Sequence, residues 1–285
     1  MDESFDELRP LLFSIAYRMV GSVSEAEDVV QDAFVRYQRV DPATIESPKA
    51  YLSTVVTRLA IDHLRSARVR RETYVGTWLP EPLVTDEGSV EAHAETADSL
   101  SMAFLVLLES LSPTERAVLL LRDVFGYGYG EIAATIGKNE ENCRQIAVRA
   151  RRSVEARKPR FEVSRRRREE LAERFFAAAE RGDDRELLDM LAHDVVAYGD
   201  GGGKAPAFPQ PVVGRERIVR LLRGLRERTP IAFTRSEPAT INGQPGAIFR
   251  GADGRPAFVV VIDVADDLVQ TIHAIANPDK LAHLS

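Results

Sequence analysis

Two short helices joined by a tight turn are indicated by the stretch Tyr129-Gly-Glu-Ile-Ala-Ala-Thr-Ile-Gly-Lys-Asn-Glu-Glu-Asn-Cys-Arg-Gln-Ile-Ala-Val-Arg-Ala-Arg-Arg152. Gly137 has the backbone freedom that a sharp turn between helices requires. Asn139 is a residue type that caps helices, and here it precedes the second helix. Apolar residues recur at helical spacing on the inner face of the pair: Ile132, Ala133, Ile136, Cys143, Ile146, Ala147 and Ala150.

The outward face of the second helix is polar and basic, with one valine. Its residues are Arg144, Gln145, Val148, Arg149 and Arg152. Arg and Gln side chains reach base edges and phosphates in the major groove. We therefore predict a DNA-reading helix-turn-helix in which Arg144, Gln145 and Arg149 contact bases. Arg151 and Arg152 would contact the DNA backbone. A solvated helical hairpin is the alternative interpretation of this stretch taken alone.

Composition sets limits on the rest of the chain. The 285 residues predict about two domains, and the net charge is −6. Basic residues cluster at 65–71 and 144–168, whereas acidic residues cluster at 25–32 and 86–98. The single cysteine excludes an internal disulfide framework. The sequence has no secretory signal and no apolar run that would span a bilayer, so we expect a cytoplasmic protein without membrane contacts.

A first helical domain is predicted over residues 3–72. Ser24 and Glu27 have the spacing of a capping box for its second helix. Ser47 and Pro48 mark the start of a further helix, with Ser as the cap and Pro in the first turn. Polar residues follow one face of each helix: Glu25, Asp28, Gln31 and Asp32 on one, and Thr54, Arg58, Asp62 and Arg65 on the other.

Residues 73–98 form a predicted linker with an acidic second half. It contains the only tryptophan, in Trp78-Leu-Pro-Glu-Pro82, and Pro80 and Pro82 exclude a regular helix there. Because Trp78 offers a large apolar surface, we expect it to dock on one of the domains. Composition does not separate two interpretations of the acidic residues 86–98, a nucleic-acid mimic and a flexible spacer.

A second helical domain, residues 99–158, is predicted to contain a capping box at Ser112–Glu115 followed by the helix-turn-helix. From residue 165 to 285 the pattern changes to helices followed by strands. This order predicts an α+β domain with an antiparallel sheet. The expected helices are 165–181, 184–191 and 214–226, and the expected strands are 233–235, 239–242, 246–250, 257–264 and 269–275.

Three segments of the helical part resemble the sigma-70 family of RNA polymerase sigma factors, of the extracytoplasmic-function type. They are Glu25-Ala-Glu-Asp-Val-Val-Gln-Asp-Ala-Phe34, Tyr51-Leu-Ser-Thr-Val-Val-Thr-Arg-Leu-Ala-Ile-Asp-His-Leu-Arg65, and Leu111-Ser-Pro-Thr-Glu-Arg116 with the helix-turn-helix. The three together, in this order, are highly specific, and the resemblance covers residues 3–158. Gly128 and Gly130 depart from the family pattern, in which a Ser and an acidic residue are frequent.

The resemblance implies promoter-directed initiation with core RNA polymerase, through its beta and beta-prime subunits, and with promoter DNA. The residues implied to bind the polymerase are Glu25, Asp28, Gln31 and Asp32. Recognition of the −10 element falls on Arg58, Asp62, Arg65, Arg68, Arg70 and Arg71. The residues implied to recognise the −35 element are Arg144, Gln145, Arg149, Arg151 and Arg152. No His, Cys and Asp set has metal-ligand spacing, and no serine or cysteine nucleophile has an obvious base, so we expect no metal, no cofactor and no catalytic residue.

The tail, residues 165–285, resembles a SnoaL-like domain, a cone-shaped α+β fold. Three short motifs match a group of sigma factors that carry such a tail: Trp78-Leu-Pro-Glu-Pro82, Asp200-Gly-Gly-Gly-Lys204 and Asn277-Pro-Asp-Lys-Leu281. Resemblance to that group implies that the tail is a built-in regulator of the sigma factor. The resemblance thus implies regulatory roles for these residues: Trp78, Pro80, Pro82, Asp200, Gly201, Gly202, Gly203, Lys204, Asn277, Pro278, Asp279 and Lys280.

Other functions remain as alternatives. The glycine run at 201–203 lacks the spacing of a phosphate-binding P-loop. SnoaL-like enzymes suggest Tyr198, Asp200, Asp263 and His273 as titratable candidates for an isomerase or hydrolase pocket. A polymerase-independent regulator with a ligand-binding tail is the second alternative, and whether the tail binds a small ligand stays open. We expect a monomer when the protein is free.

Overall fold

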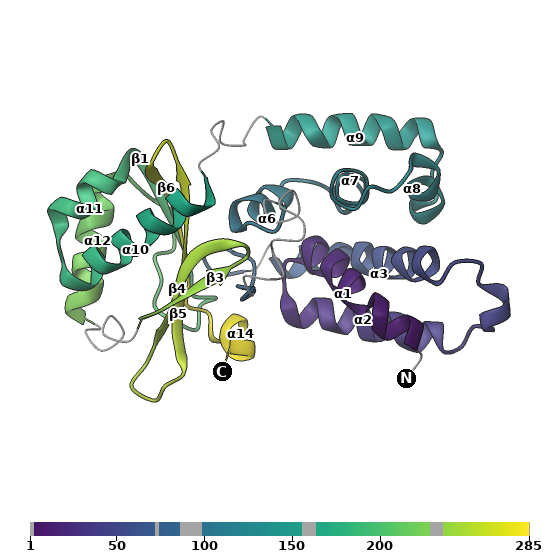
Figure 1. The fold of residues 1–285 in the computed structure, drawn as a ribbon, viewed down its shortest axis with the longest axis horizontal. Coiled ribbons are helices and arrows are strands. Elements are labelled where there is room, and N and C mark those ends of the chain that lie inside the picture. Colours follow the sequence, from purple (N-terminus) through teal and green to yellow (C-terminus); the bar gives the residue numbers. More distant parts are fainter. Residues whose placement is uncertain (1–2, 72–73, 86–98, 156–163, 229–235, 285) are drawn as a thin grey trace. The chain divides into compact units, whose positions relative to one another are not determined.

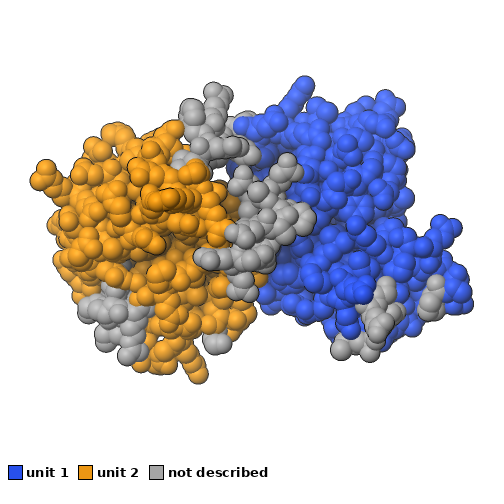
Figure 2. All heavy atoms as spheres, viewed as in Figure 1, with its two compact units in different colours: residues 1–73, 104–158 blue, residues 74–103, 159–285 orange. Residues whose placement is uncertain are grey.

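The computed structural model describes residues 3–71, 74–85, 99–155, 164–228 and 236–284. The chain divides into two compact units, shown in different colours in Figure 2. Unit 1 consists of residues 1–73 and 104–158, and unit 2 consists of residues 74–103 and 159–285. Residues 74–103, which connect the two predicted helical domains in sequence, therefore belong to the same unit as the tail.

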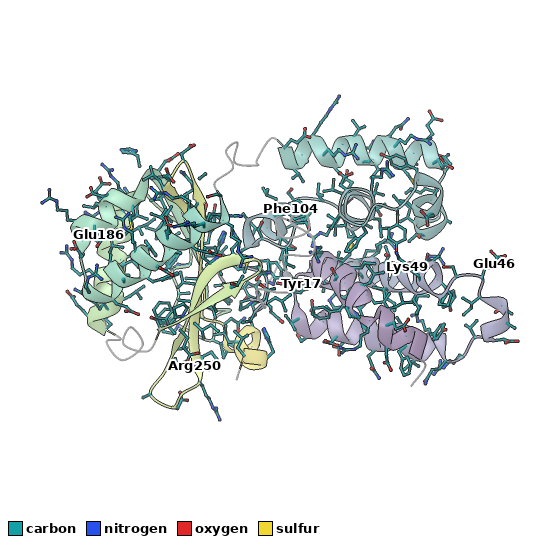
Figure 3. All side chains as sticks on the ribbon, viewed as in Figure 1. Tyr17, Glu46, Lys49, Phe104, Glu186 and Arg250 are labelled. Carbon is teal, nitrogen blue, oxygen red and sulfur yellow. The ribbon has the colours of Figure 1, made fainter. Side chains whose placement is uncertain are left out.

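Unit 1 is helical, as the sequence predicted (Figure 1). Its elements are α1 (Glu3–Val20), α2 (Val23–Tyr37), the 3-10 turn η1 (Pro42–Thr44), α3 (Pro48–Arg71), α7 (Pro113–Leu119), the π-helical segment η2 (Leu120–Val124), α8 (Tyr129–Ile136) and α9 (Glu140–Glu155). Helix α6 (Met102–Leu108) lies where the sequence passes from unit 2 to unit 1. Tyr17 of α1 is fully buried, whereas Glu46 and Lys49 project from the surface (Figure 3).

The N-terminal cap of α2 differs from the prediction. The cap is Ser22, whose hydroxyl accepts a hydrogen bond from the Glu25 backbone N–H at 3.1 Å, and Ser24 lies inside the first turn. Both serines precede an acidic residue at capping distance, so the sequence pattern alone offers two registers. The predicted caps Ser47, Ser112 and Asn139 are confirmed, each accepting from a backbone N–H three residues later.

The predicted helix-turn-helix is present as α8, a turn at Gly137, and α9. Gly137 has a φ of 68°, in the left-handed region that glycine adopts without strain. The inner faces of both helices pack on α7 and η2 in a core of Val118, Leu121, Ile132, Ala133, Cys143, Ile146 and Ala147. This packing leaves the opposite face of α9 in contact with solvent.

Unit 2 contains a twisted sheet covered by helices on one side (Figure 1). Its helices are α10 (Arg165–Arg181), α11 (Asp184–Met190), α12 (Arg215–Arg228), α14 (Pro278–Leu281) and the 3-10 turn η3 (Ala282–Leu284). Its strands are β1 (Leu191–Asp200), β2 (Val212–Val213), β3 (Ser236–Ile241), β4 (Gln244–Arg250), β5 (Pro256–Ala265) and β6 (Leu268–Ile275), in the order β2-β1-β6-β5-β4-β3. Of the predicted strands, 233–235 lies outside the described residues.

The expected all-antiparallel sheet is wrong in one respect, because β1 pairs with β6 in parallel. The sequence pattern missed strand β1 and also the short strand β2. Of the two, β1 provides the parallel pairing. It begins directly at the end of α11, and its register shifts between Leu191 and Val196, around the exposed His193 and Asp194. That irregularity interrupts the alternation by which a strand is recognised. The predicted α+β class of the tail is confirmed, with a mixed sheet.

The two faces of the sheet are covered differently. Side chains facing α10, α11 and α12 are apolar and include Ala197, Phe249 and Ile272. Because side chains alternate along a strand, the neighbouring residues Tyr198 and His273 point to the opposite face. That face also carries α14 (Figure 1) and the connecting segment. We use the name strap for the described parts of that segment, residues 74–85 and 99–103.

The strap is hydrogen-bonded to the edge of the sheet. Thr85 donates its backbone N–H to the Thr240 carbonyl at 2.9 Å, next to a β-bridge between Val84 and Ile241. Asn242 accepts from the Leu83 N–H at 3.0 Å and donates to the Leu100 carbonyl at 3.1 Å. The strap thus extends the sheet beyond β3, and the fully buried Asn242 joins its two parts.

Candidate functional site

The outward face of α9 presents the side chains predicted to read DNA. Arg144, Gln145, Arg149 and Arg152 are all exposed there. Arg144 is oriented by its neighbours, because its guanidinium lies 5.2 Å from the centre of the Tyr129 ring and 2.7 Å from the Glu140 carboxylate. A guanidinium held in this way keeps N–H groups available for a base edge or a phosphate.

Arg151 differs from the other arginines of α9. Its guanidinium donates two hydrogen bonds to the Asp123 carboxylate, at 2.8 and 2.5 Å. These bonds raise the pKa of Arg151 above its usual range. The side chain ties α9 to the end of η2, so it supports the helix-turn-helix within the protein.

The acidic face of α2 is open to solvent over most of its length. Asp28, Gln31 and Asp32 are exposed, and Val35 one turn later is 36% exposed. Glu25 is less exposed, and its carboxylate lies 3.0 Å from the His63 ring of α3. The arrangement combines carboxylates with an apolar side chain on one helix face, which suits a protein partner with a basic surface.

Helix α3 is joined to the helix-turn-helix inside unit 1. Arg58 donates to the backbone carbonyls of Ala134 and Thr135, both at 2.8 Å, near the C-terminal end of α8. The hydroxyls of Thr54 and Thr135 are 3.0 Å apart. Arg58, which is predicted to read the −10 element, is therefore in direct contact with the helix-turn-helix that is predicted to read the −35 element.

Two further side chains join helices within the helical part of the chain. Tyr127 donates to the Ser53 hydroxyl at 2.7 Å. Arg116, 3% exposed, donates to the Met19 carbonyl at 2.6 Å and to the Leu108 carbonyl at 2.8 Å. Further along α3, Asp62 and Arg65 are exposed and 3.3 Å apart. The side chains of Arg68, Arg70 and Arg71 lie outside the described residues.

The three motifs for which a regulatory role is predicted meet in unit 2 around a buried ion pair. Asp200 at the end of β1 is fully buried, and its carboxylate lies 2.7 Å from the Lys280 ammonium of α14. The same carboxylate accepts from the Tyr74 hydroxyl at 2.5 Å and from the Leu79 N–H at 2.8 Å. Trp78 covers the ammonium, which lies 4.2 Å from the centre of its ring.

Asn277 completes this cluster, which we call the latch: Tyr74, Trp78, Asp200, Asn277 and Lys280. Its amide donates to the Tyr74 hydroxyl at 2.9 Å, and its carbonyl oxygen caps α14. The Lys280 ammonium also donates to the Leu79 carbonyl. A buried ammonium with a carboxylate, a carbonyl and an aromatic face around it has its charge compensated on several sides. The expectation that Trp78 docks on a domain is confirmed, and the domain is the tail.

The glycines after Asp200 allow their loop to pack closely against residues 205–207, Asn277 and Val75 of the strap. A Cβ on Gly201 would lie 2.2 Å from the Ala205 carbonyl oxygen, and one on Gly202 would lie 2.3 Å from the Asn277 amide. Gly202 and Gly203 also have positive φ angles, 57° and 70°. Lys204 is exposed, and its ammonium lies 2.5 Å from Asp279. The loop is thus fitted to the latch and to the neighbouring strap.

Comparison with known proteins identifies the family. Residues 5–70 match the Sigma-70 region 2 family model, and residues 101–154 match the model for Sigma-70, region 4. The chain is 39% identical to the ECF RNA polymerase sigma factor SigJ of Mycobacterium tuberculosis, over 97% of this chain and 91% of SigJ. The chain belongs to the ECF sigma factors. Sigma factors of this family bind core RNA polymerase and promoter DNA and are not enzymes.

Two further matches extend over the tail of this ECF sigma factor. The probable ECF sigma factor SigI of M. tuberculosis is 30% identical over 96% of this chain and 92% of its own length. The crystal structure of M. tuberculosis SigJ superposes with a TM-score of 0.80 at 37% identity, covering 99% of this chain and 98% of that one. The tail is thus shared with relatives in the same family.

The titratable candidates of the tail are not gathered in a pocket under its helices. His273, 2% exposed, lies 2.8 Å from Asp263, and Asp263 accepts a hydrogen bond from Gln244. Gln244 in turn accepts from the Met102 N–H of the strap at 2.8 Å. The Tyr198 ring stacks on His273 at 5.7 Å. This network lies on the strap side of the sheet, whereas the helix side is filled by the apolar core.

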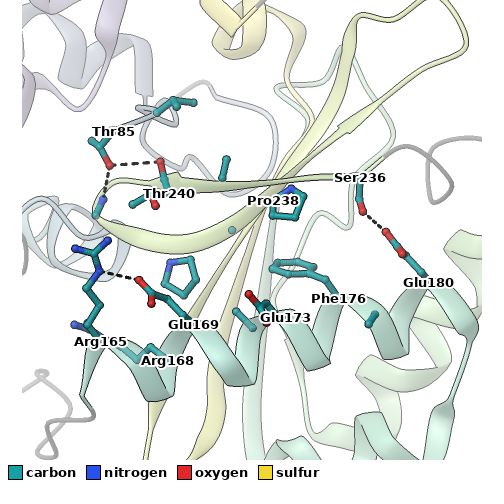
Figure 4. Close-up of a pocket in the computed structure, with 17 residues that line it drawn as sticks. Thr85, Arg165, Arg168, Glu169, Glu173, Phe176, Glu180, Ser236, Pro238 and Thr240 are labelled. Atoms are coloured by element: carbon teal, nitrogen blue, oxygen red, sulfur yellow. Dashed lines mark hydrogen bonds and ion pairs between the residues drawn. The ribbon is translucent and has the colours of Figure 1, made fainter. Parts of the chain in front are cut away.

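A groove of about 830 Å³ lies at the edge of the tail sheet of this sigma factor (Figure 4). It runs between α10 and β3, with Phe176 and Pro238 on opposite walls. Arg165 and Glu169, 2.7 Å apart, mark the end of the groove that the strap borders through Thr85. Within the described residues, no set of three or more His, Cys, Asp or Glu is placed to hold a metal. The described helices include none that is long and apolar enough to cross a membrane.

Several contact residues were not predicted from the sequence. Tyr74 and Asn242 hold the strap, and Thr135 receives Arg58. Tyr74 is an aromatic residue just before the Trp-Pro motif, which was a usable signal. Asn242 precedes Gly243, a pair that indicates only a turn. Thr135 has no local signature, because its partners Thr54 and Arg58 are more than 70 residues away in sequence.

The latch should weaken at alkaline pH through Tyr74. Burial and the hydrogen bond to the Asp200 carboxylate raise the pKa of Tyr74, so the folded state favours the neutral phenol. A tyrosine in the unfolded chain ionises near pH ~10. The contribution of Tyr74 to stability is therefore complete below about pH 10 and is lost as the pH rises toward the raised pKa of the folded state.

Denaturation followed by Trp78 fluorescence at pH 8 and pH 11 would measure this effect, because the chain has one tryptophan. We expect the Tyr74→Phe variant to lose less stability between the two pH values than the wild type. Tyr51→Phe, in unit 1, should behave as the wild type does. An equal loss in Tyr74→Phe and in the wild type would contradict the assignment.

Proposed function

We propose that this sigma factor docks on the beta and beta-prime subunits of core polymerase through the α2 face of Asp28, Gln31 and Asp32, with Glu25 at its edge. In the same proposal α3 recognises the −10 element and the outward face of α9 recognises the −35 element. The exposure of Arg144, Gln145 and Arg149 on α9 supports the last assignment. Arg151 would act indirectly, by holding α9 on Asp123.

In this proposal, the observed structure of unit 1 is a state that cannot initiate transcription. The −10 and −35 elements are about 25 base pairs apart, which is about 85 Å at about 3.4 Å per step. Arg58 and Thr54 of α3 contact α8 directly, so α3 and the helix-turn-helix cannot reach both elements while these bonds persist. Initiation then requires α3 and α8 to separate.

The tail would control this separation in cis. The observation that carries the proposal is that residues 74–103, the covalent connection between the two sigma domains, are part of the tail unit. A free segment of that length spans up to about 100 Å when extended, enough for both promoter elements. Held by the latch and by β3, the strap has fixed points of attachment, and its release would let the domains move apart.

Run-off transcription with core polymerase on fragmented genomic DNA tests the proposal. The full chain should give discrete start sites sharing −10 and −35 motifs. Trp78→Ala, which uncovers the Lys280 ammonium, should raise the output several-fold because it loosens the strap. Val75→Ala is the matched control, since Val75 is a strap residue that is 65% exposed.

Equal output from Trp78→Ala and the wild type would refute control through the latch. Absence of start sites from all three proteins, with core polymerase active under another sigma factor, would refute promoter-directed initiation. DNA binding without polymerase would then favour the alternative of a polymerase-independent regulator.

Arg149 and Arg151 offer a contrast on one helix. Arg149→Ala should lower −35-dependent initiation about tenfold or more, because a bidentate base contact is worth about 1–3 kcal/mol. Arg151→Ala should change the −35 sequence preference little, because its guanidinium is occupied by Asp123. The measurement is initiation on promoters with each −35 position varied. A loss of base preference in Arg151→Ala and none in Arg149→Ala would reverse the two roles.

The tail is proposed to be non-enzymatic. Asp263 and His273 bond to each other and, through Gln244, to the strap. Their hydrogen bonds serve the attachment of the strap, and the apolar core fills the helix side of the sheet.

A further inference from the structure

One residue of the DNA-reading face of α9 is apolar. The Val148 side chain is 44% exposed, and its neighbours on that face are Arg144, Gln145, Arg149 and Arg152. Arg144, Gln145 and Arg152 lie three or four positions away from Val148 and are therefore its neighbours on the helix surface, and Arg149 follows it directly in sequence. In contrast, Val118 of α7 and Val154 near the end of α9 are buried.

Packing inside the protein does not account for Val148. The inner face of α9 consists of Cys143, Ile146, Ala147, Ala150 and Val154, and Val148 lies outside this set. Other large apolar residues with comparable exposure among the described residues are Val35, Val75, Val84, Val213 and Leu225, none of which belongs to the helix-turn-helix. Because Val148 lies on the basic face of α9 and outside its core, its side chain is available to contact an external partner.

The neighbouring side chains restrict what that partner is. Arg144 is drawn toward the start of α9 by Glu140 and by the ring of Tyr129, so it leans away from Val148. A valine has no hydrogen-bond donor and cannot contact a phosphate as an arginine does. Among the groups that base pairs display in the major groove, the apolar one is the C5-methyl of thymine.

We propose that Val148 reads a thymine C5-methyl group in the −35 element and is a specificity-determining residue of this sigma factor. The inference rests on the proposed entry of α9 into the major groove of that element. The two Val148 methyl groups would pack on the thymine methyl, while Gln145 and Arg149 on either side bond to neighbouring base edges. An unmethylated pyrimidine at that position would leave the valine facing water.

The test uses holoenzyme made from the full chain and core polymerase, on a promoter mapped by run-off transcription. Each thymine of the −35 element is replaced in turn by deoxyuridine, which removes the methyl group and keeps every base-pairing hydrogen bond. One replacement should lower open-complex formation by wild-type holoenzyme about fourfold, the effect of one methyl contact. Val148→Ala should cause a similar loss on the thymine template and no further loss on that deoxyuridine template.

Val213→Ala, a change at an exposed valine of the tail, is the matched control and should retain the full dependence on the methyl group. The inference is overturned if no thymine shows methyl dependence, or if the losses from Val148→Ala and from deoxyuridine multiply at every thymine. A promoter with a scrambled −35 element distinguishes failure of the proposed −35 role of α9 from failure of the proposed role of Val148. If scrambling has no effect on initiation, the proposed −35 role of α9 fails and the inference fails with it. If scrambling abolishes initiation while deoxyuridine has no effect, only the role of Val148 fails.

Discussion

Replacing Asp200 with alanine should lower the free energy of unfolding of unit 2 by about 3–5 kcal/mol, the cost of removing one partner from a buried ion pair. The Lys280 side chain is 7% exposed and would keep its charge without its carboxylate. The Tyr74 hydroxyl and the Leu79 N–H would lose their acceptor in the same change. Trp78 stands over Lys280 and is the only tryptophan, so its fluorescence reports this transition directly.

Two further variants separate charge burial from general damage at this site. Lys204→Ala breaks an ion pair in the same loop, but its side chains are 57% and 62% exposed. Its cost should be about 0–1 kcal/mol, the usual value for a surface pair. The double variant Asp200→Leu with Lys280→Met removes both charges and should recover part of the loss. A loss below about 1 kcal/mol in Asp200→Ala would show that the buried pair contributes little to stability.

The helices of unit 1 were predictable because their signals are local. A cap, an apolar stripe and a glycine lie within one or two turns of each other, as at Ser112 and Gly137. The error at α2 arose where Ser22 and Ser24 offered two registers of the same signal. Strand β1 was missed because its bulge at His193 and Asp194 breaks the alternation, and its partner β6 lies about 75 residues later.

The site was predictable only in part for the same reason. The motifs around Trp78, Asp200 and Lys280 were recognised singly, but no local pattern gives the ion pair that joins Asp200 to Lys280 across 80 residues. The exposure of Arg149 followed from helical periodicity, whereas the occupation of Arg151 by Asp123 did not. Long-range hydrogen bonds depend on the packed tertiary structure, which helical spacing does not encode.

Locking α3 to α8 with a disulfide should abolish promoter-directed initiation. The Thr54 and Thr135 hydroxyl oxygens are 3.0 Å apart, so cysteines at both positions place their sulfur atoms close to bonding distance. The chain has one cysteine, the buried Cys143, and Cys143→Ala provides a background without other thiols. In that background, oxidised Thr54→Cys with Thr135→Cys should initiate at least about tenfold less than the same protein after reduction. Each single-cysteine variant should be insensitive to the oxidant.

Measuring the binding of the oxidised protein to core polymerase shows whether initiation is lost because polymerase binding fails or because promoter opening fails. The exposed α2 face of Asp28, Gln31 and Asp32 does not take part in the crosslink, so the oxidised protein should still bind core polymerase. Binding without promoter opening is the result that the proposal requires, because a covalent bond of about 2 Å between α3 and α8 excludes contact with two elements about 85 Å apart. Full initiation by the crosslinked protein would mean that the contact of Arg58 with α8 persists in the initiating complex. The arrangement of unit 1 in which α3 contacts α8 would then be the active form.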